Sequence, residues 1–395
     1  MNDTIRDVVF VDGVRTPFGK AGKLFEDTRA DDLIIRAIRT LLRRNPGLPP
    51  ERVDEVALAA TTQIGDQGLT LGRTAALLSG LPRSVPGYSI DRMCAGAMTA
   101  VTSVASAIAS RQYDIAIAGG VESMSNHPMG EGVDPNPRII AERLVDPDAL
   151  QMGVTAENLH DLYPQLTKER ADAYAVQTQQ RYAAAVDKLA GDITTMAARS
   201  DEGWTIATGD ELPRPSTSME GLANLRTPFR PHGRVTAGTS SPNTDGATAC
   251  LLTDAETAAE LGLPVAMRMV GFAFAGVDPE TMGVGPIPST EKALARAGLT
   301  IDDIGLFEIN EAFAVQVLAF LDHFKIADDD PRVNPWGGAI AMGHPLAASG
   351  VRLMTQLARE FAEHPEVRYG ITTMCVGLGQ GGTVIWENPN FKGAK

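Results

Sequence analysis

Two cysteines lie in runs of small residues where a thiol could act on a substrate. Cys94 lies in the run 91–97, DRMCAGA, at the expected start of a helix that is rich in Ala, Ser, Thr and Gly. The positive end of a helix dipole and its free N–H groups favour a thiolate, which makes Cys94 a candidate nucleophile. A packed core cysteine is the commoner fate of a free thiol, and this run taken alone favours that role.

The second thiol, Cys375, follows an apolar run at 369–373 that predicts a strand. Glycines at 377, 379, 381 and 382 come directly after it and would leave backbone N–H groups accessible beside the thiol. The run lacks the GxxxxGK[ST] order of a phosphate loop. No GxGxxG sequence opens a helix after a first strand either, so nucleotide-binding folds are disfavoured.

A histidine and an asparagine could complete a reactive set. His344 lies in the Gly-rich run 336–350, ahead of a helix predicted at 351–361. Its imidazole could take a proton from a thiol or donate to an oxyanion, and the alternative is a loop histidine bonded to backbone. Asn310 lies in the run 308–313, where its neutral amide could hold a water. The histidines without such a setting are His127, His160, His232, His323 and His364.

Alternating strands and helices must position these segments. Apolar runs predict strands at 8–11, 55–60 and 114–119, and helical patterns occur at 31–44 and 73–78. From 123 to 243 Pro, Gly, Asp and Asn become frequent, and 168–190 is the one helix predicted there. Strand character returns at 247–252 and 265–270. The sequence therefore predicts an α/β core interrupted by an insertion.

A weak internal repeat indicates two similar halves. Gly47-Leu48 followed by the run 51–56 resembles Gly298-Leu299 followed by the run 302–307, at a constant offset of 251 residues. In each copy we expect a helix that ends at the glycine and a strand that follows.

Composition limits the function classes. The 395 residues are 44% hydrophobic and carry a net charge of −14 with no basic cluster, which argues against nucleic acid or an anionic membrane as the main partner. The N-terminal segment has no continuous apolar core, so we expect a cytoplasmic protein, and 93–110 reads as a buried helix rather than a membrane span. The three cysteines are widely separated, so neither a disulfide framework nor a structural zinc site is indicated.

Taken in order, these segments resemble the thiolase family over nearly the whole chain. The resemblance is carried by Val14-Arg-Thr-Pro-Phe-Gly19, Cys94, Val235-Thr-Ala-Gly-Thr-Ser-Ser241, Asp245-Gly-Ala247, Asn310-Glu-Ala-Phe313, Gly337-Gly-Ala-Ile-Ala341, Gly343-His-Pro345 and Cys375-x-Gly377-x-Gly379. It implies an α/β, thiolase-like fold with two similar halves packed in αβαβα layers. The implied divisions are an N-terminal half (1–122, with 246–270 returning to it), a CoA-binding loop domain (123–245) and a C-terminal half (271–395), with the site between the halves.

The resemblance also implies a reaction. Thiolases cleave a 3-oxoacyl-CoA with free CoA, or run the reverse Claisen condensation, through an acyl-cysteine. By this resemblance Cys94 is the nucleophile and Cys375 protonates the departing carbanion. His344 would take the Cys94 proton and, with a water held by Asn310, stabilise charge on oxygen, while the backbone N–H groups of Cys94 and Gly377 form a second oxyanion site. No metal or cofactor is implied, because coenzyme A is a substrate.

The resemblance extends to substrate contacts. Ser241 would contact the pantetheine arm and Arg214 would lie near the nucleotide end, while Met152, Met282 and Phe313 would line the channel. For Arg214 a solvated charge, and for the methionines ordinary core, are open alternatives.

The sequence departs from the family pattern at two places. Ala95-Gly96-Ala97 follows the nucleophile where Ser or Ala and then Ser-Gly are frequent, and Ala347 stands where Gly is usual. Gln151 replaces a histidine of biosynthetic acetoacetyl-CoA thiolases, and the 239–241 and 377–381 runs look more like degradative thiolases. We therefore expect a β-oxidation enzyme, with a biosynthetic acetoacetyl-CoA thiolase as the alternative.

Two further classes are weighed against this interpretation. A decarboxylating ketoacyl synthase pairs its cysteine with His/His or His/Asn, so Cys375 argues against it. A non-catalytic CoA- or lipid-binding partner should have lost a reacting group, and none of the four is missing here. The resemblance implies a homodimer or a dimer of dimers, or a hydratase/dehydrogenase partner subunit, and the sequence does not choose among them. Acyl chain length, branching and a sterol side chain depend on the shape of the insertion.

Overall fold

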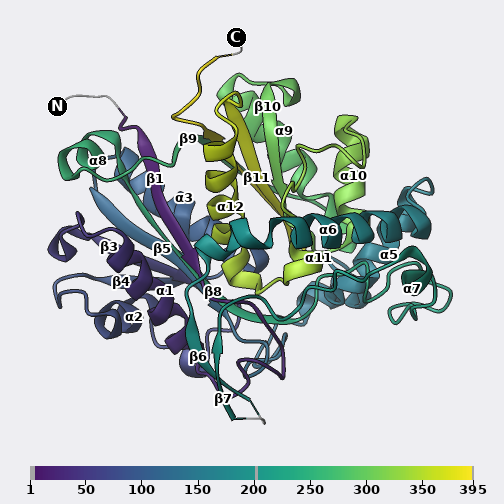
Figure 1. Cartoon of the computed structure of the whole chain (residues 1–395). Coiled ribbons are helices and arrows are strands. Elements are labelled where there is room, and N and C mark those ends of the chain that lie inside the picture. The colour runs from purple at the N-terminus through teal and green to yellow at the C-terminus, as the bar shows by residue number, and fades with distance from the viewer. Residues whose placement is uncertain (1–4, 201–202, 394–395) are drawn as a thin grey trace.

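The computed structural model describes residues 5–200 and 203–393, apart from the side chain of Ser200. Figure 1 shows two α/β halves side by side, the N-terminal half in purple and blue and the C-terminal half in green and yellow. A region in teal runs along one side of both halves. The two similar halves and the insertion that the sequence predicts are therefore present.

Each half is built on a mixed sheet. The N-terminal sheet contains β1 (Val8–Arg15), β2 (Gly19–Lys20), β3 (Glu55–Ala59), β4 (Gly87–Ile90), β5 (Ile115–Glu122) and β8 (Thr244–Asp254). The C-terminal sheet contains β9 (Met267–Gly276), β10 (Ile304–Ile309), β11 (Tyr369–Val376) and β12 (Gln380–Glu387). Several strands run past their predicted ends, because buried polar residues and glycines there break the apolar pattern.

The two halves repeat one strand pattern. In the first, β3 is parallel to β5, β5 antiparallel to β8, and β8 antiparallel to β1. In the second, β10 is parallel to β11, β11 antiparallel to β12, and β12 antiparallel to β9. A short pairing of β1 with β9 joins the sheets in the order β10-β11-β12-β9-β1-β8-β5-β3-β4. The two expected sheets are therefore hydrogen-bonded to each other at one edge.

Two helices form the layer between the sheets. α3 (Gly96–Ala109) and α12 (Ser349–Glu363) contact each other and the strands of both halves. Gly350 permits this approach, because a Cβ there would lie 2.4 Å from the backbone nitrogen of Met98. Phe10 and Trp386 lie in the same buried cluster, and their rings meet edge to face with centroids 5.9 Å apart.

The outer helices pack on the two sheets. α1 (Ala30–Arg44) and α2 (Leu71–Ser79) pack on the N-terminal sheet, near α8 (Ala255–Leu261). α9 (Pro286–Ala297) and α10 (Ala314–Phe324) cover the C-terminal half. α1 has two acidic residues in its first turn and two basic residues in its last, which complements the helix dipole. None of the helices in the described residues is long and apolar enough to cross a membrane.

The insertion contains more regular structure than predicted. It holds α4 (Arg138–Ala141), α5 (Met152–Leu162), α6 (Lys168–Leu189), α7 (Met219–Ala223) and a hairpin of β6 (Met196–Ser200) and β7 (Gly203–Ala207). The predicted helix at 168–190 is confirmed as α6. The expectation that it is the one helix there is wrong, because α5 lacks a side-chain N-cap and contains Gly, Val and Thr early, and its stability comes from packing on α10.

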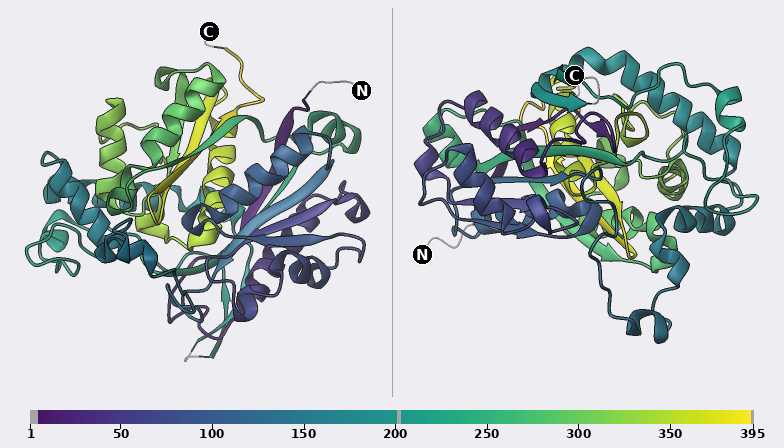
Figure 2. Two further views of the ribbon diagram at one scale, coloured as in Figure 1. Left: turned by 180° about the vertical axis from the view of Figure 1, so that it is seen from behind. Right: turned by 90° about the horizontal axis from the view of Figure 1, so that it is seen from below.

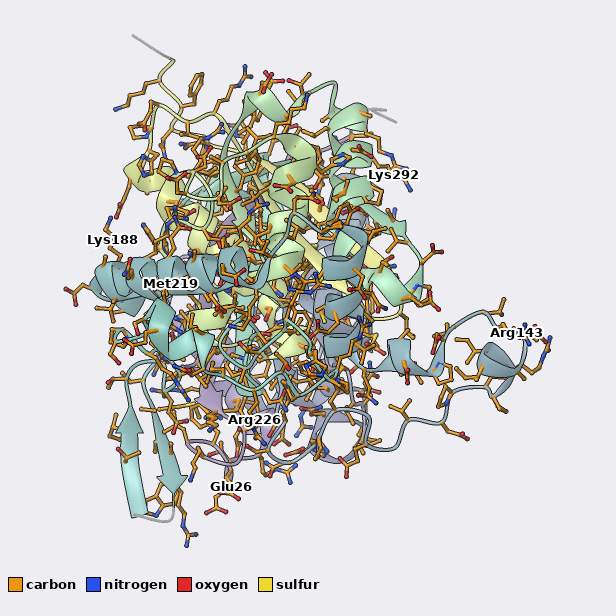
Figure 3. The ribbon with its side chains drawn as sticks, turned by 90° about the vertical axis from the view of Figure 1, so that its right-hand side faces the viewer. Glu26, Arg143, Lys188, Met219, Arg226 and Lys292 are labelled. Carbon is orange, nitrogen blue, oxygen red and sulfur yellow. The ribbon has the colours of Figure 1, made fainter. Side chains whose placement is uncertain are left out.

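The edges of the insertion stand away from the body of the molecule. Figure 2 shows the segment with α4 hanging below the rest of the chain in the view from below. In Figure 3 Arg143 lies at the end of this segment, and the β6–β7 hairpin projects from the opposite side. The divisions at 122, 245 and 270 stay a prediction, and the last falls inside β9, which pairs with β12 on both sides of it.

The repeat differs in its helix ends. Gly298 ends α9 in a left-handed conformation with φ +67°, as expected. In the first copy α1 ends earlier, with Asn45 at its C-cap, so the expectation of a helix that ends at Gly47 is wrong. Gly47 instead allows the chain to lie close to Leu261, because a Cβ at position 47 would lie 2.9 Å from the Leu261 carbonyl oxygen.

Candidate active site

Cys94 lies in a tight turn between the two halves. It occupies a 3-10 turn at Met93–Ala95, immediately before α3, and its side chain is buried. The turn is entered through Met93, whose φ of 45° is unusual for a residue with a side chain, and the Met93 N–H donates to Asp91 Oδ1 at 2.6 Å. This backbone holds the sulfur against the C-terminal half.

Burial decides the protonation state of Cys94. It raises the pKa of this thiol to about 12, although N–H groups of Gly377 and of Cys94 itself donate to the sulfur and act in the opposite direction. The expectation that a helix start favours the thiolate is therefore wrong for the resting protein. A short 3-10 turn separates the sulfur from α3, and removal from water outweighs the donors.

The backbone donors of Cys94 and Gly377 converge on one point. Gly377 follows β11, and its N–H reaches the Cys94 sulfur from the other half of the molecule. A Cβ at Gly377 would lie 2.7 Å from Cε of Met93, so the close approach favours glycine. The turn continues through Leu378 and Gly379, both with positive φ. The structure thus brings together the two residues predicted to form an oxyanion site.

Cys375 lies near Cys94 at the end of β11. Its side chain is buried, and both burial and the nearby Cys94 sulfur raise the pKa of the Cys375 thiol. Both thiols are therefore neutral at pH 7 in the resting protein. The third cysteine, Cys250, is buried in β8, where it pairs with Ala118 and Gly13.

His344 lies in the loop between α11 (Ala339–Met342) and α12. Its Nε2 lies 3.2 Å from Asn310 Nδ2, and its Nδ1 lies 2.6 Å from Ser349 Oγ. Its backbone N–H donates to Thr244 Oγ1 at 3.0 Å. Burial and the charge of Arg352 lower the pKa of His344 to about 3, so the imidazole is neutral at pH 7.

Asn310 follows β10 and is fully buried. Its N–H donates to the carbonyl oxygen of Thr373 at 2.9 Å, which ties it to β11, and its side-chain oxygen accepts from Arg352. The structure therefore pairs Asn310 directly with His344. The turn Leu346–Ala348 after His344 packs against the turn that carries Cys94, which brings the two pairs into one site.

The buried carboxyl group of Glu122 supports the Leu346–Ala348 turn. Glu122 at the end of β5 accepts from the Ala347 N–H at 3.1 Å and from Gln67 Nε2 at 3.2 Å. The extra methyl of Ala347 faces Gly96. A Cβ at Gly96 would lie 3.3 Å from that methyl, so the glycine leaves room for it.

Sequence reasoning missed the buried polar residues behind the site. Arg352, Gln356 and Glu360 on α12 and Glu308 on β10 are buried and connected to one another. The signal was present, because three polar residues spaced by four form a stripe on a helix whose remaining pattern is amphipathic. Solvent exposure is the ordinary interpretation of such a stripe, and only the structure shows that it faces inward.

The predicted channel residues share an apolar cluster with Cys375. Met282 and Phe313 belong to the same buried apolar cluster as Cys375, and Met152 packs on it. Phe313 forms a bridge with Ser240, and the Ser241 N–H donates to the carbonyl oxygen of Ala312 at 2.9 Å. These contacts connect the apolar cluster to the segment that carries Ser241.

A cavity of about 520 Å³ lies in the inserted region. Ser241 and Arg214 line it, and its charged lining residues are Arg214 and Lys20. The Arg214 backbone N–H donates to Gln179 Oε1 at 2.7 Å, which fixes the segment, while the Arg214 side chain is exposed. Met152, Met282 and Phe313 are outside this lining, so the predicted binding residues form two groups.

Comparisons with known proteins identify the family. A family model of the N-terminal thiolase domain matches residues 8–256, and one of the C-terminal thiolase domain matches residues 263–388. The chain belongs to the thiolase family. Its thiolase fold is also that of two solved structures, Bacillus anthracis acetyl-CoA acetyltransferase and human mitochondrial 3-ketoacyl-CoA thiolase, each with a TM-score of 0.87. The first is 33% identical and covers 98% of this chain and 100% of its own, and the second is 34% identical and covers 97% and 99%.

Curated thiolases match over nearly their full length. The 3-ketoacyl-CoA thiolase of Pseudoalteromonas translucida is 42% identical, with 96% of this chain and 98% of the relative covered. The 3-oxoadipyl-CoA/3-oxo-5,6-dehydrosuberyl-CoA thiolase of Escherichia coli is 41% identical, with 97% and 100% covered.

Proposed function

We propose that this thiolase is an acetyl-CoA C-acyltransferase that cleaves a 3-oxoacyl-CoA with free CoA. The products are acetyl-CoA and an acyl-CoA shortened by two carbons, and the reverse reaction is a Claisen condensation. The observation that carries the proposal is the meeting of two buried thiols, Cys94 and Cys375, with the His344–Asn310 pair at the junction of the halves. Relatives named 3-ketoacyl-CoA thiolase support it.

The first half-reaction forms an acyl-enzyme. The Cys94 proton moves to Nε2 of neutral His344 as the sulfur attacks the keto carbon. The bond between that carbon and the α carbon breaks, and its electron pair leaves with acetyl-CoA as a carbanion. The Cys375 thiol protonates this carbanion and becomes a thiolate. A buried, neutral Cys375 suits this step because an acid must hold its proton until the carbanion forms.

The second half-reaction releases the shortened product. The CoA thiol gives its proton to the Cys375 thiolate, and the CoA sulfur attacks the thioester carbonyl on Cys94. The N–H groups of Cys94 and Gly377 can donate to the oxyanion of the tetrahedral intermediate. Cys94 then leaves as a thiolate and takes its proton back from the His344 imidazolium, so both thiols and the imidazole return to their starting states.

The CoA part of the substrate supplies the groups that the protein binds. CoA is a polyanion on a long pantetheine arm, and a chain of net charge −14 must hold it through local donors. The cavity with Lys20, Arg214 and Ser241 offers two cationic side chains and a hydroxyl for this purpose. Met152, Met282 and Phe313 would then contact the acyl chain near Cys375. The proposal requires no metal and no cofactor besides the substrate CoA.

The cellular setting is part of the proposal. Relatives named 3-ketoacyl-CoA thiolase favour fatty-acid β-oxidation over a biosynthetic role, and we propose that the enzyme acts in the cytoplasm. A homodimer or dimer of dimers is the proposed assembly, with association with a hydratase/dehydrogenase subunit as its alternative.

Thiolysis of a 3-oxoacyl-CoA series tests the function. Loss of enolate absorbance is followed from acetoacetyl-CoA to long chains, products are identified by mass, and Cys94→Ala is the inactive reference. A rate that rises with chain length supports a degradative enzyme, whereas a preference for acetoacetyl-CoA supports the biosynthetic type. Absence of turnover on every chain length contradicts the proposal.

A further inference from the structure

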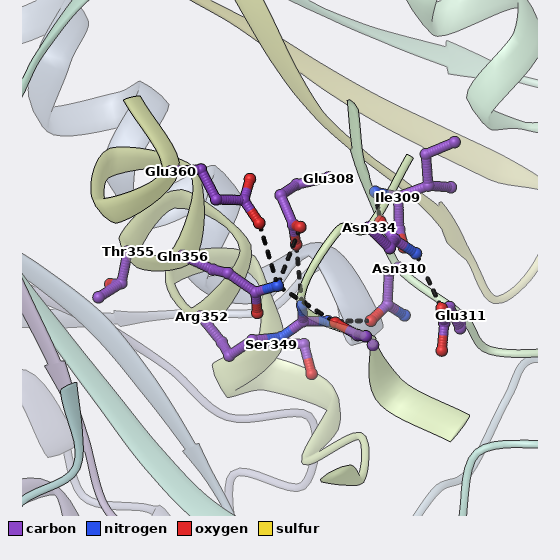
Figure 4. Close-up of polar contacts among 12 residues, drawn as sticks. Glu308, Ile309, Asn310, Glu311, Asn334, Ser349, Arg352, Thr355, Gln356 and Glu360 are labelled. Atoms are coloured by element: carbon purple, nitrogen blue, oxygen red, sulfur yellow. Dashed lines mark hydrogen bonds and ion pairs between the residues drawn. The ribbon is translucent and has the colours of Figure 1, made fainter. Parts of the chain in front are cut away.

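A buried arginine faces the Asn310 amide from helix α12. The Arg352 side chain is 2% exposed, and Figure 4 shows it between Glu308 and Asn310. Its Nη1 donates to Glu308 Oε2 and its Nη2 donates to Asn310 Oδ1, each at 3.2 Å. A guanidinium has donors only, so the Asn310 atom that faces it is the amide oxygen. The amide NH2 group therefore points toward His344.

This orientation determines which ring nitrogen of His344 carries a proton. Asn310 Nδ2 lies 3.2 Å from His344 Nε2 and is a donor, so Nε2 must accept. In a neutral ring the proton is then on Nδ1, 2.6 Å from Ser349 Oγ. The Ser349 hydroxyl donates in turn to the carbonyl oxygen of Pro345 at 3.0 Å.

The hydrogen bonds form a series from Arg352 to the Pro345 carbonyl, and this series can run in one direction only. Arg352 can only donate and the Pro345 carbonyl can only accept, so every bond between them points from Arg352 toward Pro345. A reversed Asn310 amide would set its NH2 group against the guanidinium and leave buried donors without acceptors. Unpaired donors destabilise a protein interior, so the observed orientation is preferred.

We propose that Arg352 is a positioning residue for the reaction: it fixes the Asn310 amide, and through it keeps His344 as the neutral ring with an unprotonated Nε2. The inference rests on the proposed function, in which Nε2 exchanges the hydrogen bond from Asn310 for the Cys94 proton. Arg352 lies behind Asn310 in the protein interior and acts through it.

The side chains around Arg352 hold the guanidinium in place. Glu308 Oε1 accepts from Gln356 Nε2 at 3.0 Å, and the same nitrogen lies 3.1 Å from the carbonyl oxygen of Gly337 and 3.4 Å from Glu360 Oε1. Burial and the neighbouring Glu308 raise the pKa of Glu360 well above its usual range, so Glu360 retains its proton at pH 7. Glu308 is the carboxylate that pairs with Arg352, and the cluster therefore carries little net charge.

The test reads the tautomer of His344 directly. Full-length protein with ¹⁵N-labelled histidine is studied by long-range proton–nitrogen NMR, in which protonated and unprotonated ring nitrogens have well-separated shifts. The His344 signals are identified by their loss in His344→Gln. We expect a protonated Nδ1 and an unprotonated Nε2 near neutral pH. The opposite tautomer in the wild-type protein would overturn the proposal.

Two variants test the two sides of the Asn310 amide. Asn310→Asp keeps an acceptor for Arg352 but removes the donor to His344, so the ring proton should move to Nε2. The double variant Glu308→Gln with Arg352→Met removes the ion pair without leaving a lone buried charge. It should show a mixture of tautomers and a kcat about 100-fold lower, with little change in KM for CoA. Retention of the wild-type tautomer in both variants would also overturn the proposal.

A matched control lies on the same helix. Thr355 Oγ1 donates to the Val351 carbonyl oxygen at 2.8 Å, a local bond of the same kind as that of Ser349, and Thr355→Val should keep the wild-type tautomer and kcat.

If the double variant does not fold by circular dichroism, Arg352→Lys, which retains a donor, should keep the wild-type tautomer, and Asn310→Asp decides the outcome. A protein with the expected tautomer but no thiolysis on any substrate would contradict the proposed function and leave this inference standing.

Discussion

The N–H of Gly377 in the C-terminal half donates to the Cys94 sulfur in the N-terminal half. This contact joins the halves at the proposed reacting atom, and it explains why no single segment of the sequence contains the site. The donors that touch the sulfur in the resting protein are the same ones that would stabilise an oxyanion on a thioester formed there. Little reorganisation is therefore required between the two states.

Cys375→Ala should separate acylation from carbon–hydrogen chemistry. Cys94 keeps its donors in this variant, so acylation by acetyl-CoA should persist. Exchange of the α protons of acetyl-CoA with deuterium from solvent should fall roughly 10²- to 10⁴-fold, the usual contribution of a general acid–base group. Proton NMR of acetyl-CoA in D2O measures the exchange. Cys250→Ala is the control, since that thiol is buried in β8 and has no part in the proposed reaction, and exchange at the wild-type rate in Cys375→Ala would contradict the role given to Cys375.

Alkylation of Cys94 should accelerate steadily with pH. Burial raises the pKa of this thiol to about 12, so the thiolate fraction of the free enzyme grows throughout the range from about pH 7 to about pH 10. The measurement is the rate of iodoacetamide labelling of the Cys94 peptide, followed by mass. A rate that is already constant across this range would mean that the resting enzyme holds a preformed thiolate.

The sequence predicts which residues are reactive better than it predicts the environment around them. Cys94, Asn310, His344 and Cys375 stand out because Gly-rich segments surround them, and the structure places His344 on Asn310 and Cys375 near Cys94. The protonation state of Cys94 could not be predicted, because local sequence reports the donors of a turn but not how much protein from the other half covers the sulfur.

Tertiary packing also overrides local patterns in the fold. α5 has weak helix signals and forms because it packs on α10, whereas α6 has a Thr167 cap and a long helical pattern and was predictable. Arg352 is typical of a surface residue in its helical pattern, yet it is buried against Glu308 and Asn310, which lie in and directly after β10 and are more than 40 residues away in sequence. Contacts between distant segments cannot be read from spacing.

A buried ion pair should control the stability of the junction between β1 and the insertion. Arg15 and Asp210 form a bidentate pair at 2.6 and 2.8 Å, with side chains 2% and 0% exposed. Asp210 also accepts from the Phe18 N–H and the Tyr182 hydroxyl, each at 2.8 Å. Arg15→Met leaves the carboxylate buried without its partner and should lower the free energy of unfolding by about 3–5 kcal/mol in urea titrations.

An exposed pair provides the comparison for that prediction. Arg52 and Glu260 lie 2.7 Å apart with side chains 31% and 62% exposed, so Arg52→Met should cost less than about 1 kcal/mol. Equal losses in Arg15→Met and Arg52→Met would show that burial of the first pair has no energetic consequence.

Neutralising the cavity should weaken CoA binding. Lys20→Gln and Arg214→Gln each remove one of the charged residues that line the cavity. An exposed ion pair contributes up to about 1 kcal/mol, so each change should raise KM for CoA by up to about fivefold with kcat nearly unchanged. The salt dependence of KM should become weaker in the double variant. Thiolysis at several ionic strengths measures both, and a fall in kcat with an unchanged KM would place CoA elsewhere.

Trapping the covalent intermediate tests whether Cys94 is the residue that carries the acyl group. The protein is mixed with acetyl-CoA without an acceptor, quenched in acid, digested and mapped by mass spectrometry, with Cys94→Ala, Cys250→Ala and Cys375→Ala in parallel. We expect an acetyl group on the Cys94 peptide of the wild-type, Cys250→Ala and Cys375→Ala proteins, which is lost on adding CoA and absent from Cys94→Ala. An acetyl group on Cys375 or Cys250 instead, or no adduct while thiolysis proceeds, would contradict it.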